Sequence, residues 1–201
     1  MTRLLMTALL LATSGAGLGA DFELEPAGSS LKFIAVQQAA RFESRFEKFS
    51  AEVRFDPAEP ASGRIRARVD LVSVDTGNPE RDEVLKAADW FGVERWPEAV
   101  FSADRIVRSG EGFAASGTLS LRGVERPVTL QFDWTPPGSA GPARLVGAAA
   151  LKRLEFGVGQ GDWRDTTYVG DRVEVRVDIR LHEIQASVKS VSTKEGSKSA
   201  R

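Results

Sequence analysis

The sequence contains no cysteine, which excludes disulfide bonds, thiolate metal sites and cysteine nucleophiles. It has one histidine, His182, so a serine protease triad or a histidine-based zinc site would have to include that residue. His182 falls on the polar phase of a predicted strand and nothing around it matches either site, so we interpret it as a surface residue. The 27 basic and 28 acidic side chains give a net charge of −1, and this balance gives no indication of nucleic-acid binding.

Long apolar runs are also missing, except at the N-terminus. Arg3 precedes a short apolar run, and small residues follow it up to Ala20. This arrangement predicts a secretory signal peptide over residues 1–20, too short to be a mature membrane span, with Ala16 as the competing cleavage position. An uncleaved N-terminal anchor is the alternative. We therefore expect a periplasmic or secreted protein that does not span a membrane after cleavage.

Most of the remaining chain alternates between apolar and polar residues, which is typical of half-buried strands. In the clearest case Ile65, Val69 and Leu71 share one face, whereas Arg66 and Asp70 share the other. The predicted strands are 29–36, 49–55, 64–71, 99–108, 113–121, 128–134, 145–152 and 173–181. The apolar phase slips within the fourth of these strands, which predicts a bulge there.

Three segments depart from the strand pattern. Residues 37–48 are compatible with either a strand or a mobile turn, and residues 135–142 are so rich in proline and glycine that they predict a loop. From residue 185 to residue 201 the chain is rich in serine and lysine and has nothing to bury, which predicts a disordered basic tail.

A helix is expected between Asp75 and Phe101, where the alternation stops. Asn78 can cap a helix and Pro79 suits its first position, and the acidic residues that follow lie near the positive end of the helix dipole. Such a short helix is not stable alone. It must therefore pack against the apolar faces of the strands.

Eight alternating strands with short connections predict an all-β fold, an antiparallel sheet closed into an eight-stranded barrel with one short helix between strands three and four. A two-sheet sandwich would give the same periodicity and stays open at this point. Gly147 and Ala149 on the seventh strand, with Ala115 and Gly117 on the fifth, put small side chains on the inner face. An eight-stranded barrel can hold one small ligand, so these residues favour a cavity, and the nearly uncharged inner faces favour an apolar ligand.

Large apolar residues on the inward phase, together with the aromatic residues that follow the helix, form the predicted pocket wall. They are Phe33, Phe55, Ile65, Val69, Leu71, Trp90, Phe91, Phe101, Phe113, Leu119, Leu130, Phe132, Trp134, Leu145, Val175 and Ile179. Arg81 and Arg153 are candidates for contacting a ligand headgroup, because arginine hydrogen-bonds phosphate and carbonyl oxygens well. An ion pair with a neighbouring aspartate is the alternative role for either arginine.

Catalytic and metal-binding motifs are weak in this sequence. Asp75-Thr-Gly77 imitates the aspartic-protease motif, but that chemistry needs two aspartates and the motif occurs once, so a turn is the preferred interpretation. Asp162, Asp165 and Asp171 are close enough in sequence to suggest a calcium site or an acid pair, although loop structure explains them better. We therefore predict no enzyme activity, no metal and no cofactor.

Several segments, taken together and in order, resemble the YceI-like family. They are Phe46–Phe49 followed by Val53–Pro57; Asp75–Gly77 with Arg81, Asp82 and Leu85; Asp89–Phe91 with Trp96, Pro97 and Phe101; Gly117–Val128; and Phe156–Trp163 before Val169–Val173. The resemblance covers the predicted domain at residues 21–184. Family members often carry histidines near the start and after the end of the first strand, where this chain has Gly28-Ser29 and Gln37-Gln38.

This resemblance implies an exported, lipocalin-like barrel that sequesters or carries an isoprenoid-type lipid, either a polyprenyl chain or an isoprenoid quinone. Composition and spacing by themselves indicate only an apolar ligand. An enzyme that acts on a lipophilic substrate inside the barrel is the alternative, but none of the assigned inner positions carries a titratable group. A membrane electron-transfer protein is a further expected partner, with the basic tail as a weak surface contact.

Overall fold

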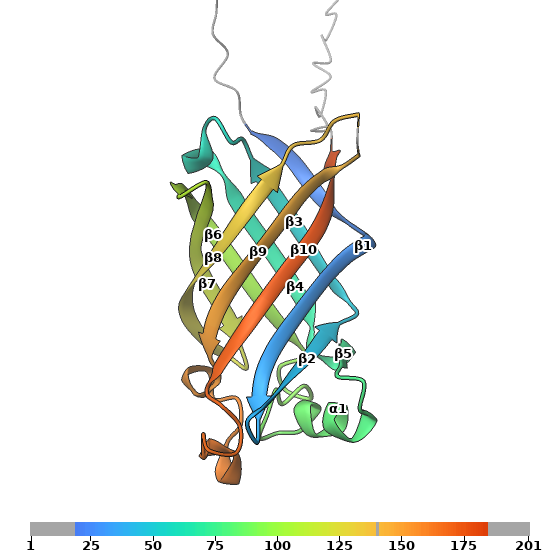
Figure 1. Ribbon diagram of the computed structural model, residues 1–201, viewed down its shortest axis with the longest axis vertical. Helices are drawn as coiled ribbons and strands as arrows, with labels where there is room; N and C mark the ends of the chain where they lie inside the picture. The colour runs from blue at the N-terminus through green and yellow to red at the C-terminus, as the bar shows by residue number, and fades with distance from the viewer. Residues whose placement is uncertain (1–18, 140, 185–201) are drawn as a thin grey trace, which may run out of the picture.

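The computed structural model describes residues 19–139 and 141–184 of the chain (Figure 1). The predicted basic tail and the predicted signal peptide up to residue 18 lie outside these residues. Ala20 is the first residue of a strand and pairs with Phe55. Within the described residues, no helix has the length and apolar character needed to cross a membrane.

Eight antiparallel strands close into a barrel (Figure 1). Around the barrel they are β1 (Ala20–Gln37), β3 (Phe49–Phe55), β4 (Arg64–Asp70), β6 (Glu98–Ser109), β7 (Gly112–Leu121), β8 (Val124–Thr135), β9 (Ala143–Lys152) and β10 (Arg172–Ile184). Strand β10 pairs back with β1 and closes the ring. Two further strands, β2 (Ala40–Phe46) and β5 (Val74–Asp75), extend the sheet beside β1. The closed ring confirms the predicted barrel and excludes the open two-sheet sandwich.

The predicted helix is α1 (Pro79–Lys86), which lies across one end of the barrel (Figure 1). The side-chain oxygen of Asn78 accepts hydrogen bonds from the backbone N–H groups of Glu80 and Arg81, at 3.0 and 3.1 Å. Pro79 opens the helix and Leu85 is its buried residue. Short 3₁₀ helices complete the described fold: η1 (Pro60–Ser62), η2 (Leu71–Ser73), η3 (Arg153–Phe156) and η4 (Gly161–Arg164).

Strand β1 is longer than its sequence pattern predicts, because a bulge interrupts it. Glu25 pairs with Arg180, but the next pair along the ladder is Ser30 with Asp178. The Ser29 hydroxyl donates a hydrogen bond to the Glu25 carbonyl and accepts one from the Arg180 N–H, so it replaces part of the missing ladder. The predicted bulge in β6 is confirmed by a register shift between Ala103 and Arg105.

The ambiguous segment 37–48 forms strand β2, which pairs with the second half of β1. The turn between the two strands consists of Gln38 and Ala39, with φ values of 50° and 63°. Two-residue hairpin turns of this kind prefer Asn-Gly, because L-residues with side chains are strained at positive φ. The sequence therefore lacks the usual turn signal, which explains why periodicity alone could not decide the segment.

The barrel interior is filled unevenly along its axis. At the end near the two termini of the described chain, aromatic rings pack edge to face, with Phe55 at 4.8 Å from Phe113 and 5.1 Å from Trp134 between ring centroids. We call these rings, with Phe22 and Phe132, the aromatic plug. A second cluster lies at the α1 end and includes Phe33, Leu85 and Phe91.

The turn at Ala39 generates a testable prediction for stability. Replacing Ala39 with glycine removes the strain of a left-handed backbone, so we expect Ala39→Gly to raise the free energy of unfolding by about 0.5–1 kcal/mol. Ala58→Gly is the matched control, because Ala58 is also exposed but is not among the described residues with positive φ. The control variant Ala58→Gly should lower the free energy of unfolding, because glycine makes the unfolded chain more flexible. Urea unfolding followed by circular dichroism measures both, and the same sign for the two variants would contradict the assignment of strain.

Candidate ligand-binding cavity

An apolar cavity of about 220 Å³ lies inside the barrel, between the aromatic plug and the α1 end. Its walls come from the inward phase of all eight barrel strands, and β2 and the segments after α1 and η3 close it. Of the sixteen predicted wall residues, twelve line this cavity: Phe33, Ile65, Val69, Leu71, Trp90, Phe91, Phe101, Leu119, Leu130, Leu145, Val175 and Ile179. The cavity wall is therefore built mainly from the residues that strand periodicity points inward.

Small side chains explain why the cavity is not filled by the protein. Ala51 on β3 pairs with Ala67 on β4, and Ala149 lies on the wall of β9. All three line the cavity. At the plug end, aromatic rings fill the interior instead. Because a closed eight-stranded sheet fixes the width of the interior, short side chains leave space that neighbouring side chains do not reach.

Two chain segments close the cavity at the α1 end. The segment after α1 contributes Trp90 and Phe91, and the segment between β9 and β10 contributes Phe156, which is 1% exposed. The two segments are joined directly. The Asp89 carbonyl accepts hydrogen bonds of 2.8 Å from the N–H groups of Gly159 and Gln160, and the rings of Trp90 and Trp163 lie 5.3 Å apart.

Arg153 is the only charged residue on the cavity wall within the described chain, and it is 4% exposed. Its guanidinium donates five hydrogen bonds, all to backbone carbonyls: those of Val158, Gly159, Trp163, Val169 and Gly170, at 2.6–3.2 Å. An arginine has five N–H donors, so every donor is used. Burial lowers the pKa of the Arg153 guanidinium, and the nearby Asp171 partly offsets this effect. Arg153 thus holds the segment between β9 and β10 in a folded loop.

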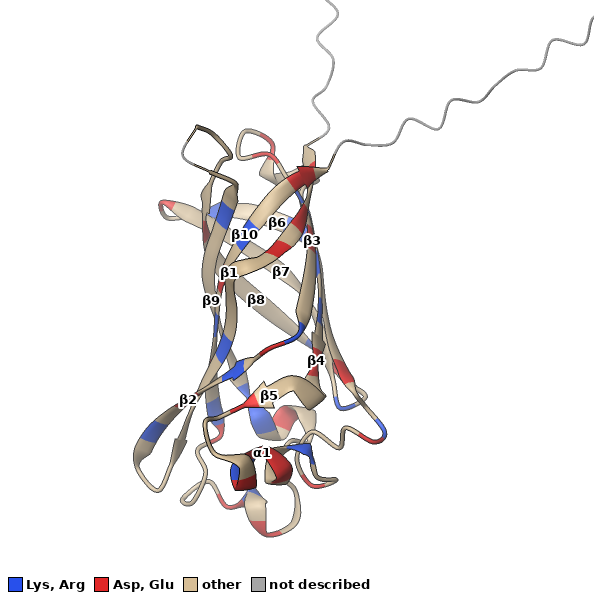
Figure 2. Ribbon diagram, turned by 90° about the vertical axis from the view of Figure 1, so that its right-hand side faces the viewer, with Lys and Arg blue, Asp and Glu red and all other residues tan. Residues whose placement is uncertain are grey.

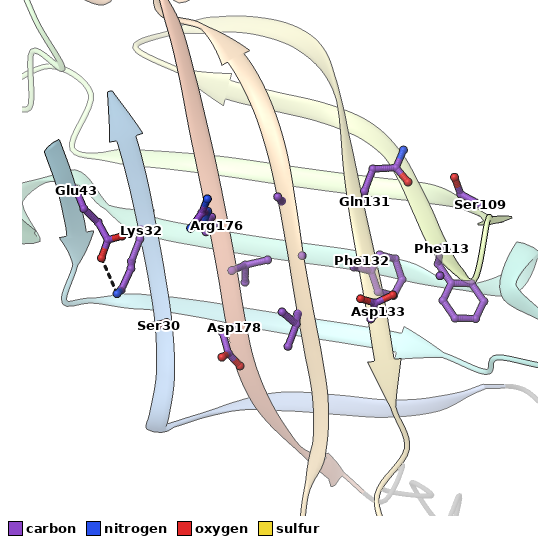
Figure 3. Close-up of a pocket in the computed structure, with 15 residues that line it drawn as sticks. Ser30, Lys32, Glu43, Ser109, Phe113, Gln131, Phe132, Asp133, Arg176 and Asp178 are labelled. Carbon is purple, nitrogen blue, oxygen red and sulfur yellow. Dashed lines mark hydrogen bonds and ion pairs between the residues drawn. The ribbon is translucent and has the colours of Figure 1, made fainter. Parts of the chain in front are cut away.

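A second hollow of about 560 Å³ lies on the outer face of the barrel, across β8, β9, β10 and β1 (Figure 3). We call it the outer depression. Its floor includes Gly147 and Ala148. Lys32 donates a 2.7 Å hydrogen bond to Glu43 and thereby lowers the pKa of that carboxyl group. In contrast to the cavity, this hollow is open and has charged and polar side chains as well as apolar ones on its wall. Figure 2 shows that basic and acidic residues are interspersed over the strands.

The sequence matches the YceI-like domain over residues 22–181. The chain belongs to the YceI-like family. A UPF0312 protein of Serratia proteamaculans is 30% identical over 156 residues, which cover 74% of this chain and 81% of the relative. The crystal structure of Burkholderia cenocepacia BcnA is similar with a TM-score of 0.74 at 30% identity, covering 78% of this chain and 98% of BcnA.

A polyisoprenoid-binding domain from Saccharophagus degradans has the same fold, with a TM-score of 0.64. It is 18% identical and covers 84% of this chain and 100% of the domain. At this identity the likeness concerns the fold. The YceI-like barrel is therefore shared by proteins with quite different sequences, and the cavity must be interpreted from the residues of this chain.

Four predicted wall residues do not line the cavity of this YceI-like barrel. Phe55, Phe113, Phe132 and Trp134 belong to the aromatic plug, where they pack against one another. Their inward phase was predicted correctly. Their position along the barrel axis was not predicted. Alternation with a period of two shows which face of the sheet a residue lies on, but not which side chains it contacts in the interior.

The predicted headgroup contacts are not supported by the geometry. Arg153 has no free donor, and its acidic neighbour Asp171 accepts a hydrogen bond from the Leu154 N–H, so neither a headgroup contact nor an ion pair describes it. Arg81 lies outside the cavity wall, with its guanidinium carbon 4.7 Å from the ring centroid of Phe42. A cation–π contact holds it there.

Several wall residues were missed by the sequence analysis. Phe42 and Phe46 come from β2, which the pattern left undecided, and Phe156, Val158 and Val169 come from an irregular segment. The alternation of Phe42 and Phe46 with charged residues was the available signal for β2. The irregular segment offers no periodicity, so its apolar residues could be placed only by the structure.

The weak chemical motifs have structural roles. The Asp75 carboxylate accepts a hydrogen bond from the Gly77 N–H and pairs with Arg45, as expected of a turn. Asp165 accepts hydrogen bonds from the N–H and hydroxyl of Thr167. Nowhere in residues 19–139 and 141–184 do three or more potential metal ligands of the His, Cys, Asp or Glu type come together. The side chain of His182 is 51% exposed, as predicted.

The role of Arg153 gives the second prediction. Arg153→Lys should lower the free energy of unfolding by at least about 3 kcal/mol, because a lysine offers three donors at one point and cannot serve five carbonyls. Arg144→Lys is the control: Arg144 pairs with Asp178 on the exposed outer face, and such pairs contribute about 0–1 kcal/mol. Urea unfolding of the two variants and the parent protein measures the change in the free energy of unfolding. An Arg153→Lys variant as stable as the parent would contradict the structural role.

Proposed function

We propose that this protein binds an isoprenoid-type lipid, either a polyprenyl chain or an isoprenoid quinone, inside the barrel. It then sequesters or carries this lipid through an aqueous compartment outside the cytoplasm. The main support for this proposal is the apolar cavity. Arg153, the one charged residue on its described wall, has all its donors occupied. The N-terminal sequence supports export, and the solved relative from Saccharophagus degradans, which is described as polyisoprenoid-binding, supports the ligand class.

Hydrophobic burial supplies the affinity in this proposal. Each buried methylene contributes about 0.8 kcal/mol, so one or two isoprene units offset the cost of association. An apolar cavity of about 150 Å³ binds benzene, and the cavity of 220 Å³ is larger. It is smaller than the roughly 300–1,000 Å³ typical of sites that enclose a drug-sized molecule. The cavity therefore suits a segment of a hydrocarbon chain, with weak discrimination of chain length.

A lipophilic substrate converted inside the barrel is the competing function. Catalysis by proton transfer or by a nucleophile needs a titratable or nucleophilic side chain next to the substrate. The described wall of the cavity contains apolar residues and Arg153. A binding role is therefore favoured over an enzymatic one.

Native mass spectrometry of protein purified from its own host tests the ligand class, combined with extraction of any bound lipid. We expect a bound species with the mass of an isoprenoid lipid, or uptake of added ubiquinone or undecaprenol by the empty protein. Protein that carries no lipid and takes up neither compound would overturn the proposed function. Turnover of the added lipid into a product of different mass would favour the enzymatic alternative.

Filling the cavity gives the third prediction. Ala67 lies on the cavity wall, opposite Ala51 in the ladder, so Ala67→Phe places a ring in the cavity. We expect the affinity for a short-tailed ubiquinone analogue to fall at least about tenfold, a loss of 1.4 kcal/mol. The cost in stability should be about 1–3 kcal/mol. Arg68→Phe, on the exposed face of the same strand, is the control and should leave affinity unchanged. Titration followed by tryptophan fluorescence measures both, and unchanged affinity of Ala67→Phe would place the ligand elsewhere.

A membrane electron-transfer protein is the partner that a quinone ligand would imply, and the basic tail at residues 185–201 is the proposed contact. Deleting this tail should slow the transfer of quinone to anionic vesicles at low salt, with little effect at high salt, because salt screens surface charge. Transfer rates measured with quinone-loaded protein test this. Equal rates with and without the tail at low salt would remove its role.

A further inference from the structure

The wall of the barrel contains a seam between β8 and β9. Their ladder runs from the pair Thr135–Arg144 to the pair Gln131–Ala148 and then ends. Among the described residues, no ladder pair joins 124–130 of β8 to 149–152 of β9. Each segment remains paired on its other side, to β7 and to β10 respectively. We call the space bordered by residues 124–130 and 149–152 the β8–β9 seam.

The sequence explains why the two strands separate at this point. A Cβ atom at Gly147 would lie 2.5 Å from the Gln131 carbonyl oxygen, so the strands approach closely where they are paired. Beyond that point, Pro127 on β8 has no N–H to donate to a ladder. Residues 148–150 of β9 are alanines and offer little side chain for packing across the seam. The strands therefore approach closely where they are paired, and Pro127 cannot donate to a ladder within the seam.

The seam borders the cavity. The inward residues on its two edges, Val128 and Leu130 on β8 and Ala149 and Leu151 on β9, all line the cavity wall. Parting of these two edges would therefore connect the cavity with the outside of the barrel.

On the outer side, the seam begins at the edge of the outer depression. The last ladder pair, Gln131 and Ala148, lines that depression, and the next residues inward, Leu130 and Ala149, line the cavity. Figure 3 shows Gln131 and Arg176 on either side of β9. A molecule that emerges from the cavity at this point would leave its polar end among polar side chains and water.

In the part of the chain that the structure describes, side chains and loop segments close both ends of the barrel. At one end the rings of the aromatic plug pack with centroid distances of 4.8–5.5 Å. At the α1 end, hydrogen bonds of Arg153 and those that the Asp89 carbonyl accepts hold the two closing segments in place. Opening the seam further breaks no ladder pair of the described chain, so passage there costs less than passage through either end of the barrel.

We propose that the isoprenoid chain enters and leaves the cavity sideways through the β8–β9 seam, with its polar end remaining outside beside the outer depression. This inference rests on the proposed function and specifies how the same site is reached. It also accounts for the small size of the cavity. A hydrocarbon chain too long to fit within 220 Å³ would lie partly in the seam. The hydrocarbon would there contact Val128, Leu130, Ala149 and Leu151.

Closing the seam covalently tests the proposal. The chain has no cysteine, so introduced thiols would be the only ones. Continuing the register of the ladder places Thr129 opposite Ala150, and both are exposed. The variant Thr129→Cys/Ala150→Cys would be bridged with the shortest member of a graded series of bismaleimides that reacts. Ser50→Cys/Arg68→Cys, an exposed ladder pair of β3 and β4, is the matched control.

The probe is a short-tailed ubiquinone analogue, which quenches tryptophan fluorescence and would lie close to Trp90 on the cavity wall. Bridging the seam should slow association at least about tenfold, whereas bridging the control pair should change it less than about twofold. Protein loaded before bridging should retain the analogue through gel filtration. Each protein is compared with itself before bridging, and urea unfolding verifies that the bridged form is folded.

Equal exchange rates in the bridged and unbridged seam variant would overturn the proposal. In that case equilibrium binding of the analogue would still be observed, and the proposed function would stand. Absence of equilibrium binding to the parent protein would instead contradict the proposed function itself. The two failures are therefore distinguishable.

Discussion

Closure of the sheet is the constraint on which the rest of the structure depends. Once β10 pairs with β1, the number of strands fixes the width of the interior, and side chains can only fill that width or leave it empty. Aromatic rings fill it at one end, and alanines such as Ala51 and Ala67 leave space between those rings and the α1 end. The cavity is therefore a consequence of where large and small residues occur along the same strands.

The α1 end creates a second requirement, since irregular chain must cover an apolar space without leaving polar backbone groups unpaired. Unpaired buried carbonyls are costly. Arg153 meets this requirement for the segment between β9 and β10 by donating to five carbonyls at once. A charged side chain on the cavity wall thus serves the protein's own backbone, and the wall that a ligand meets stays apolar.

The sequence predicted the strands, the helix and the direction of most wall residues, because alternation and capping are local properties. Asn78 and Pro79 are an example: their roles depend only on neighbouring residues. The remaining features depend on residues far apart in the chain. The bulge at Ser29 interrupts the alternation, so the first half of β1 was not predicted as a strand. Phe55 could be assigned to the plug only when its partners Phe113 and Trp134 were known. The role of Arg153 in holding the loop could not be predicted, because its five acceptors have no sequence signature.

An incompletely paired wall is a hazard as well as an opening, since unpaired strand edges can pair with other chains. The edges of the β8–β9 seam carry features that oppose such pairing: Pro127 lacks a donor, and Arg126 and Lys152 bring exposed charge. The seam is also short on the β9 side, where it comprises residues 149–152. A barrel selected for stability alone would gain by extending this ladder. An unpaired stretch with these features fits the proposed passage of an apolar ligand through the seam.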